Sequence, residues 1–230
     1  MTRQVALVED ETAIRENYSE ALKRQGFAVR PYADRHSAIE SFRQELPEMA
    51  IIDIGLGDDH EGGFDLCREL RVLSPTLPIM FLSARDSDLD TISGLRLGAD
   101  DYLTKNISIS QLIARVSALF RRIDALQSEP GTDAVHRVGD LSIDLNCMQV
   151  EWKGQRVDLT LTEFWMLNSI AKIPGHVKSR DQLMQDANIF VDDGTVTSHI
   201  KRIRRKFEQL DADFDSIETI YGMGYRWNKK

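Results

Sequence analysis

The sequence of 230 residues contains little cysteine and no long apolar run. Its two cysteines, Cys67 and Cys147, lie in different halves of the chain, which excludes a disulfide framework and a cysteine-based metal cluster. No stretch approaches the roughly 20 consecutive apolar residues that a membrane-spanning helix needs. The first residues also lack a basic segment followed by a long apolar one. We therefore expect a cytoplasmic protein with no membrane partner.

Basic residues are outnumbered by acidic ones, 29 to 37, which gives a net charge of −8. This balance argues against a protein that coats nucleic acid through bulk charge. The charge is uneven, however, because residues 1–122 carry a net −5 and residues 138–230 only −1. Five of the six residues from Lys201 to Lys206 are basic, so positive charge is concentrated in one short segment.

Short apolar runs alternate with segments of helical periodicity in the first half of the chain. We expect strands at 5–8, 28–32, 49–52, 79–82 and 102–103. We expect helices at 13–25, 37–45, 64–73, 89–97 and 109 to about 125. This alternation predicts an α/β fold with a doubly wound, five-stranded parallel sheet.

Turn-forming residues such as Pro130 and Gly131 replace this periodicity near the middle of the chain. We therefore predict a domain at 1–123, a linker at 124–135 and a second domain at 136–230. In the second domain we expect strands at 141–145, 149–152 and 157–159. Helices are expected at 163–173, 180–187 and 193–210, followed by a hairpin, which makes this domain α+β.

Chemically active side chains follow successive strands of the predicted parallel sheet. These residues are Glu9, Asp10, Asp53, Ser83 and Lys105. Because ligands of such sheets bind at the carboxyl ends of the strands, we expect the five to share one site. Any one of them alone is more often a solvated loop residue, and Ser83 is alternatively the N-cap of a helix. Their occurrence at successive strand ends favours a common function.

Crowded carboxylates require a cation, and Mg²⁺ accepts one or two carboxylates while keeping sites for phosphoryl oxygens. The set therefore suggests phosphoryl chemistry. Asp53 would attack phosphorus, while Mg²⁺ and Lys105 would stabilise the oxygens of the phosphoryl group. The Ser83 hydroxyl would donate to the phosphoryl group once it is attached.

The basic segment belongs to an amphipathic helical pattern. Apolar residues recur at helical spacing and should face the core: Val196, Ile200, Ile203 and Phe207. The opposite face is expected to carry Thr195, Ser198, His199, Arg202 and Arg205. Short polar and long cationic groups on one surface suit a helix in the major groove, although a charged helix face is more often simply solvated.

About 120 residues resemble a response-regulator receiver domain of the flavodoxin-like fold. The motifs are Val-Glu-Asp-Glu at 8–11, Asp53, Leu-Ser-Ala at 82–84, and Gly-Ala-Asp-Asp-Tyr at 98–102 followed by Lys105. The resemblance implies that a cognate sensor histidine kinase phosphorylates Asp53. It also implies that the Gly55 backbone carbonyl binds Mg²⁺ together with Glu9, Asp10 and Asp53, and that Ser83 and Tyr102 form a switch pair.

Residues 137–230 resemble the winged helix-turn-helix DNA-binding domain of the OmpR/PhoB type. The motifs lie at 159–164, 179–183, 194–206 and 219–227. The resemblance implies contacts with base edges by Ser198 and Arg202. It implies phosphate contacts by Thr195, His199 and Arg204. The remaining predicted DNA-binding residues are Lys201, Arg205, Tyr221 and Arg226.

Two loops of the receiver-like part depart from the family pattern. The loop after Asp53 lacks the usual proline, is two residues longer, and adds acidic residues at Asp58, Asp59 and Glu61. These carboxylates either compete for Mg²⁺ or are solvated. Asn106 replaces a proline that follows a cis peptide bond, and a cis bond before a non-proline residue costs about 3 kcal/mol. We expect a trans bond in an adjusted loop, or a strained bond.

Two binding surfaces depart from the pattern as well. Receivers of this family dimerise through a face formed by the fourth helix, the fifth strand and the fifth helix. On this receiver dimer face, Thr91 and Gln111 replace a basic–acidic pair. The remaining charges of this face are Asp100, Asp101, Arg115 and Arg122. Because exposed pairs contribute only about 0 to 1 kcal/mol, we expect weaker dimerisation. In the wing, Tyr221 replaces an arginine of the minor groove, so we expect a phosphate or sugar contact there, with Arg226, Lys229 and Lys230 as cations.

These observations predict a transcription regulator that dimerises on phosphorylation and binds direct repeats in promoter DNA, with RNA polymerase as a further partner. One alternative is a constitutive DNA-binding protein whose receiver is a protein-interaction module and is never phosphorylated. Another is a phosphotransfer enzyme whose C-terminal domain binds protein, which predicts no salt-dependent affinity for DNA.

Overall fold

The structure is a computed structural model that describes residues 2–84, 94, 97–127, 135–187 and 193–228. The chain divides into two compact units, Met1–Ser117 and Ala118–Lys230. Within the described ranges, no helix combines the length and the apolar composition needed to cross a bilayer.

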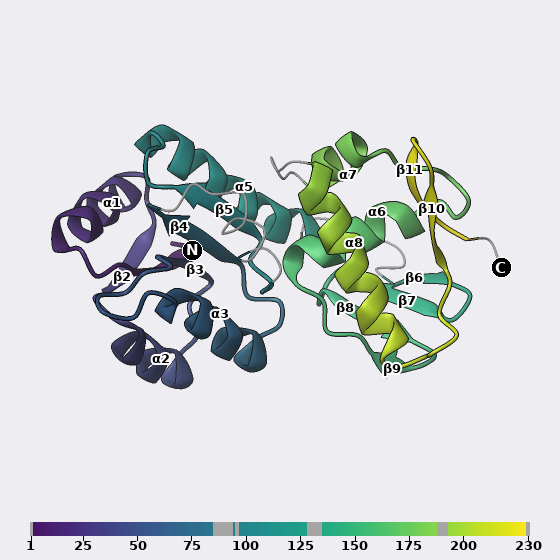
Figure 1. Cartoon of the computed structure of the whole chain (residues 1–230), viewed down its shortest axis with the longest axis horizontal. Coiled ribbons are helices and arrows are strands. Elements are labelled where there is room, and N and C mark those ends of the chain that lie inside the picture. The colour runs from purple at the N-terminus through teal and green to yellow at the C-terminus, as the bar shows by residue number, and fades with distance from the viewer. Residues whose placement is uncertain (1, 85–93, 95–96, 128–134, 188–192, 229–230) are drawn as a thin grey trace. The chain divides into compact units, whose positions relative to one another are not determined.

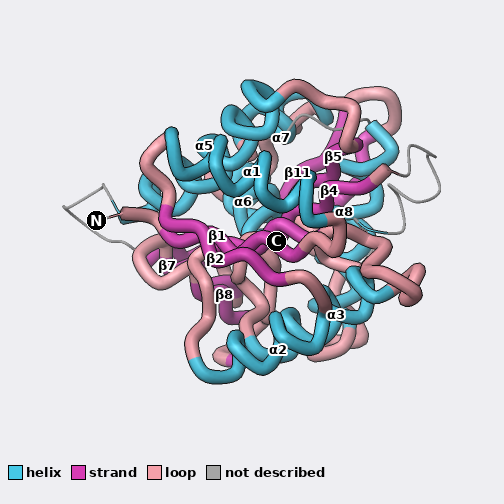
Figure 2. Tube along the Cα trace, turned by 90° about the vertical axis from the view of Figure 1, so that its left-hand side faces the viewer, coloured by secondary structure: helices cyan, strands magenta, loops and turns pink. Residues whose placement is uncertain are grey.

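The first unit is built on a parallel sheet of five strands in the order β2-β1-β3-β4-β5. The strands are β1 (Gln4–Val8), β2 (Ala28–Tyr32), β3 (Met49–Ile52), β4 (Ile79–Ser83) and β5 (Asp101–Thr104). The helices are α1 (Thr12–Arg24), α2 (Arg35–Gln44), α3 (Gly62–Leu73) and the first half of α5 (Ile109–Gln127), which continues past Ser117. Figures 1 and 2 show α1 and α5 on one face of the sheet and α2 and α3 on the other. The predicted doubly wound α/β fold is confirmed.

Burial explains why the three central strands have continuous apolar sequences. Every residue of β3 and β4 is buried, and so are the last four residues of β1. Strands covered by helices on both faces require apolar side chains at successive positions instead of alternate ones. Strand β2 lies at the sheet edge and has no fully buried residue. Because the central strands are buried on both faces, their carboxyl ends are held in fixed positions by the packing of the sheet.

Helix boundaries differ from the expected ones at several ends. Helix α2 begins at Arg35 because the Asp34 carboxylate accepts a hydrogen bond from the Ser37 backbone N–H (2.8 Å) and caps the helix. Helix α5 continues to Gln127, into the segment where we expected a linker, and the next strand begins at Val135. The helix expected at 89–97 falls almost entirely outside the described residues.

In its described residues, from 135 onward, the second unit combines a four-stranded antiparallel sheet, three helices and a C-terminal hairpin. The sheet contains β6 (Val135–Val138), β7 (Leu141–Asp144), β8 (Gln149–Trp152) and β9 (Gln155–Arg156). The helices are α6 (Leu161–Ala171), α7 (Arg180–Asp186) and α8 (Asp193–Glu208), and the hairpin pairs β10 (Ile217–Ile220) with β11 (Gly224–Trp227). The predicted α+β arrangement is confirmed.

Two strands of this unit were missed and one was wrongly expected. Strands β6 and β9 were not predicted, since Val135–Val138 carries only half-buried or exposed side chains and β9 has two residues. Residues 157–159 are described and do not form a strand, although Val157 and Leu159 are buried. Val157 makes one backbone hydrogen bond to the Val150 carbonyl of β8 (2.8 Å), but the apolar run as a whole reflects packing against the core.

Capping boxes begin the first two helices of the second unit. Thr160 and Glu163 cap α6 reciprocally, and Ser179 and Gln182 do the same for α7. Such pairs satisfy backbone N–H groups that a helix start leaves without partners. The core beneath contains an aromatic cluster in which the ring centroid of Trp152 lies 5.7 Å from Phe207 and 6.0 Å from Trp227.

Candidate functional site

The carboxyl ends of β1 and β3 bring three carboxylates together. One ligand oxygen of each of Glu9, Asp10 and Asp53 lies within 4.8 Å of the others. Glu9 and Asp53 are buried, whereas Asp10 is exposed. Lys105, which follows β5, donates to Glu9 Oε1 at 2.7 Å and to Asp53 Oδ2 at 2.6 Å. The four charged residues expected at one edge of the sheet therefore lie together.

Burial and the lysine act in opposite directions on these carboxylates. Burial raises the pKa of Asp53 above its ordinary value, and the hydrogen bond from Lys105 opposes that rise. Burial also raises the pKa of Glu9, with a further contribution from the charge of Asp53. Burial by itself would lower the pKa of Lys105, but its bonds to the two carboxylates outweigh this and raise it. Burial thus disfavours the charged forms of Glu9 and Asp53, and an additional cation beside them would stabilise those forms.

Two residues that the sequence analysis did not single out hold the strand ends in place. Arg15 donates from Nη1 to the backbone carbonyls of Glu9 (2.6 Å) and Asp10 (2.9 Å). The Tyr18 hydroxyl lies 3.4 Å from the Lys105 carbonyl oxygen. Both come from α1, so this helix positions the first and last strand ends. Their spacing within an ordinary amphipathic helix offers no signal of this role.

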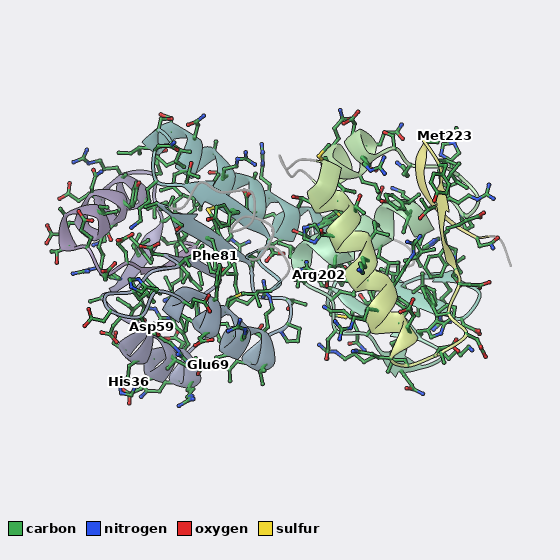
Figure 3. The ribbon with its side chains drawn as sticks, viewed as in Figure 1. His36, Asp59, Glu69, Phe81, Arg202 and Met223 are labelled. Carbon is green, nitrogen blue, oxygen red and sulfur yellow. The ribbon has the colours of Figure 1, made fainter. Side chains whose placement is uncertain are left out.

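The longer loop after Asp53 folds into a tight turn. The backbone groups of Leu56 and Asp59 exchange hydrogen bonds, and Gly57 between them has a left-handed φ of +64°. The Gly57 N–H donates to Asp10 Oδ2 at 3.0 Å, so the loop contacts the acidic group through its backbone. Asp59 approaches Arg35 of α2 at 3.8 Å. Figure 3 labels Asp59 on this side of the sheet, together with Glu69.

The added acidic residues are solvated, which is one of the two outcomes that we expected. Asp58, Asp59 and Glu61 are exposed. Among the residues that the structure describes, the three-carboxylate group of Glu9, Asp10 and Asp53 includes none of them.

Helix α3 begins in direct contact with the backbone of Asp53. The Gly63 N–H donates to the Ile54 carbonyl at 2.9 Å. A Cβ atom at Gly63 would lie 2.0 Å from the Asp53 carbonyl oxygen, which no side chain tolerates. Glycine at this position therefore allows α3 to approach the strand end, and the sequence analysis did not assign it this role.

The expected switch residues lie on neighbouring strands and are buried. Ser83 is 1 % exposed at the end of β4, and its carbonyl accepts from the Lys105 N–H at 2.7 Å. Tyr102 is 9 % exposed, with its ring centroid 6.3 Å from that of Phe81, a residue labelled in Figure 3. Both side chains thus face the interior of the first unit.

The peptide bond between Lys105 and Asn106 is trans, since no cis bond occurs among the described residues. The Ile107 N–H bonds to the Thr104 carbonyl at 3.2 Å, and the Thr104 hydroxyl donates to the Asn106 side chain. This is the adjusted loop that we expected as one of two outcomes.

The expected dimer face is only partly exposed. Asp100 is 0 % exposed; its carboxylate pairs with Arg71 at 2.9 Å and accepts from the Ile79 N–H at 3.0 Å. Our placement of Asp100 on that face was therefore wrong, because this carboxylate is buried against Arg71 and the first residue of β4. Asp101 is also buried, and it pairs with Arg115 of the same chain at 3.5 Å.

Of the other residues expected on that face, Gln111 is described with its side chain, and it bonds within its own chain. Gln111 is exposed, and its side-chain oxygen accepts from the Ser108 N–H (3.0 Å) while the Ser108 hydroxyl accepts from the Gln111 N–H (3.2 Å). It therefore caps α5. Thr91 and the side chain of Arg122 lie outside the described residues.

The apolar face of α8 was predicted correctly, but two of the five residues predicted on its polar face are buried. Val196, Ile200, Ile203 and Phe207 are buried in the second core. Thr195 and His199, which we placed on the exposed face, are each only 1 % exposed. The expectation was wrong because both lie beside the apolar stripe and not opposite it. Ser198 is half-buried, whereas Lys201 and Arg205 are exposed.

A buried carboxylate of α6 joins two cations of α8. Glu163 is fully buried; its Oε1 lies 2.8 Å from Arg202 Nε, and its Oε2 accepts from Lys206 at 2.7 Å. Burial by itself would raise the pKa of Glu163, but Arg202 and Lys206 outweigh it and lower the pKa to about 2. Arg202, labelled in Figure 3, also bonds through Nη2 to His199 Nδ1 at 2.7 Å.

The wing hairpin carries an exposed tip and an internal ion pair. Tyr221 is 96 % exposed and Met223 is 60 % exposed, and Figure 3 places Met223 at the end of the hairpin. Arg226 pairs with Glu218 of the neighbouring strand at 2.8 Å. Arg204 of α8 donates to the Ile217 carbonyl at 2.9 Å and so joins the helix to the wing. Lys229 and Lys230 lie outside the described residues.

Comparisons with known families place a different match in each half of the chain. Residues 5–117 match the family described as "Response regulator receiver domain". Residues 154–227 match the family described as "Transcriptional regulatory protein, C terminal".

Relatives that match nearly the full length are regulators by name. The chain is 38% identical to "Transcriptional regulatory protein CreB" of Escherichia coli (strain K12), and the match covers 96% of both chains. It is 36% identical to "Transcriptional regulatory protein BaeR" of Escherichia coli O6:H1, over 98% of this chain and 93% of that one.

Solved structures show a similar arrangement of elements. The response regulator DrrB, described as a Thermotoga maritima OmpR/PhoB homolog, is 29% identical with a TM-score of 0.53, over 99% of this chain and 100% of that one. A RitR mutant at 22% identity has a TM-score of 0.80 over 99% of this chain and 100% of its own, and this likeness supports the fold alone.

Proposed function

The chain belongs to the two-component response regulators of the OmpR/PhoB type, and we propose that phosphorylation of Asp53 controls how its C-terminal unit binds DNA. Its relatives are named transcriptional regulatory proteins, and the chain is a regulator and not an enzyme. The observation that carries the proposal is the group of three carboxylates with Lys105 placed on Asp53 at 2.6 Å.

The proposed chemistry is transfer of a phosphoryl group from a phosphohistidine of the cognate sensor kinase. A carboxylate oxygen of Asp53 attacks phosphorus, a P–O bond forms, and the P–N bond of the donor breaks with protonation of the imidazole. Lys105 already contacts Asp53 Oδ2, so its ammonium is positioned to stabilise negative charge on the transferred group. Burial of Asp53 keeps competing water away from the acyl phosphate.

The donor set fits Mg²⁺. Glu9, Asp10 and Asp53 would hold it through carboxylate oxygens, with the Gly55 backbone carbonyl as a further ligand. Burial raises the pKa of Glu9 and of Asp53, so a bound cation would stabilise their ionised forms. When bound, the ion neutralises these carboxylates and stabilises charge on the phosphoryl oxygens.

We propose Ser83 and Tyr102 as the residues that report phosphorylation. The Ser83 hydroxyl would donate to the phosphoryl group, and Tyr102 would fill the space that Ser83 leaves. The backbone bond from Lys105 to Ser83, at 2.7 Å, supports this by joining the two strand ends. A move of Ser83 toward the phosphate would then be felt at β5, which carries Tyr102.

The proposed consequence is receiver dimerisation and binding of two C-terminal units to direct repeats in promoter DNA. Arg115 and its partner Asp101 would be retained within each chain, so the dimer contact would rest on fewer charged pairs than is usual for the family. RNA polymerase is the further partner that a transcription regulator requires. The site of action is the cytoplasm, where Cys67 and Cys147 remain reduced.

The test compares DNA binding before and after treatment with acetyl phosphate and Mg²⁺. We expect tighter promoter binding for the treated wild type, a shifted band on a phosphate-affinity gel, and neither effect for Asp53→Ala. Asp58→Ala is the matched control, because Asp58 is an exposed carboxylate of the adjacent loop.

The two competing functions give different results in the same experiment. A constitutive DNA-binding protein would bind promoter DNA equally as untreated wild type, as treated wild type and as Asp53→Ala. It would show no shifted band. A phosphotransfer enzyme with a protein-binding C-terminal unit would show the band but no salt-dependent affinity for DNA.

A further inference from the structure

Helix α8 has one stripe that points directly away from the core. With roughly 100° per residue, Ser198, Lys201 and Arg205 lie opposite the apolar residues Val196 and Ile203. Lys201 and Arg205 are exposed, and Ser198 is half-buried. Within the described part of the chain, the side chains of Lys201 and Arg205 make no hydrogen bond or ion pair. Their charges are thus available to an external anion.

The other three cations of α8 are committed to partners within the same unit. Arg202 and Lys206 both contact the carboxylate of Glu163, at 2.8 and 2.7 Å. Arg204 donates to the Ile217 carbonyl at 2.9 Å and to the Thr219 hydroxyl at 2.7 Å. A cluster of five cations in the sequence therefore presents two free cations at the surface.

Release of Arg202 to DNA would leave a costly group behind. Glu163 is fully buried, and its Oε2 also accepts from the Thr160 N–H at 2.9 Å, so the carboxylate cannot move out with its partner. A buried charge that loses a partner is strongly destabilising. The side chain of Arg202 is itself only 17 % exposed, and its bond to His199 Nδ1 holds it against the helix.

We infer that Ser198, Lys201 and Arg205 form the DNA-contacting stripe of α8, and that Arg202 is a positioning residue held by Glu163. Lys201, between the other two, contacts base edges, and Arg205, one turn further on, contacts the phosphate backbone. This inference rests on the proposed function, since it requires that α8 enters the major groove. It replaces Arg202 by Lys201 as the residue that selects a base pair.

The experiment selects bound fragments from random DNA with the phosphorylated full-length protein. Lys201→Met and Arg205→Met each remove one free cation. The double variant Glu163→Gln/Arg202→Met removes the buried pair without changing net charge, and glutamine keeps an acceptor for the Thr160 N–H. Tryptophan fluorescence checks folding of the variants, because Trp152, Trp165 and Trp227 all lie in the second unit.

We expect Lys201→Met to lose preference at one base pair by roughly tenfold or more. Arg205→Met should keep the selected motif while the slope of log affinity against log salt falls by about 0.9, the value for one phosphate contact. The double variant should keep both the motif and the slope.

Opposite results would overturn the inference. It is wrong if the folded double variant loses preference at one base pair while Lys201→Met retains it. Should the double variant fail to fold, Arg202→Lys takes its place. Lysine keeps a positive charge beside the Glu163 carboxylate, but it lacks the bidentate fork that arginine presents to guanine. Loss of a base-pair preference in that variant alone contradicts the inference equally. Absence of salt-dependent DNA binding by the wild type would instead reject the proposed function.

Discussion

The strand ends of the parallel sheet and the surface of helix α8 differ in how their polar residues are used. At the strand ends, Glu9, Asp53 and Lys105 point at one another and leave a site for an additional ligand. On α8, Arg202 and Lys206 instead form ion pairs with the buried carboxylate of Glu163. Charged residues in a recognisable motif can thus face a ligand or stabilise the scaffold, and only their partners distinguish the two uses.

The largest expected effect is at the strand ends. Lys105→Met should slow phosphorylation of Asp53 by acetyl phosphate by about 100-fold or more, because an ammonium placed on the reacting carboxylate is lost. A phosphate-affinity gel sampled over time measures the rate. Lys23→Met is the control, since Lys23 is exposed on α1. A rate within threefold of the wild type would show that Lys105 has a structural role like that of Lys206.

The second expected effect is a loss of stability of the second unit in acid. The folded pKa of Glu163 is about 2 and its ordinary value is 4.5, so its pairing stabilises the fold above pH 4.5 and the contribution disappears as pH falls toward 2. The difference corresponds to about 3 kcal/mol. Urea unfolding followed by tryptophan fluorescence between pH 5 and 2.5 measures it.

The matched variants separate this carboxylate from the general effect of acid. Glu163→Gln should be less stable at pH 7 and should lose less stability on acidification than the wild type. Glu208→Gln, an exposed change on α8, should behave as the wild type. Equal acid sensitivity of all three proteins would show that Glu163 does not hold α8.

The contrast also explains which parts of the site could be predicted from the sequence. Parallel strands align their carboxyl ends at one sheet edge, so strand order alone brings Glu9, Asp53 and Lys105 together. Helical periodicity likewise identified Val196 and Ile203 as core residues.

The flanks of a helix could not be predicted in the same way. Thr195 and His199 lie beside the apolar stripe, where exposure depends on which neighbouring element covers them. Arg202 is engaged because a distant capping glutamate, Glu163, lies beneath it. The pairing of Asp100 with Arg71 has the same origin, since α3 and the residue before β5 meet only in the folded chain. Periodicity contains no information about such contacts.

A third expected effect tests how closely the scaffold approaches the acceptor. Gly63→Ala should destabilise the first unit by about 2 kcal/mol, because its Cβ would lie 2.0 Å from the Asp53 carbonyl oxygen and force a shift of α3. Phosphorylation should slow in parallel. Gly55→Ala is the control for stability alone, since a Cβ there has no atom within 4 Å. Calorimetric unfolding measures both variants, and equal stability would exclude the close contact.

The smallest expected effect concerns Gln111 of α5, which replaces a charged residue of the family's dimer face. Gln111→Ala should destabilise the first unit by about 1 kcal/mol, because the Ser108 N–H loses its acceptor at the start of α5. Gln111→Glu retains that acceptor and should leave the melting temperature unchanged. If the alanine variant instead keeps its stability but dimerises less on phosphorylation, as sedimentation velocity would show, Gln111 contributes to the dimer face. The cap explains why an amide can occupy this position without an opposing cation, since its partner, Ser108, immediately precedes the same helix.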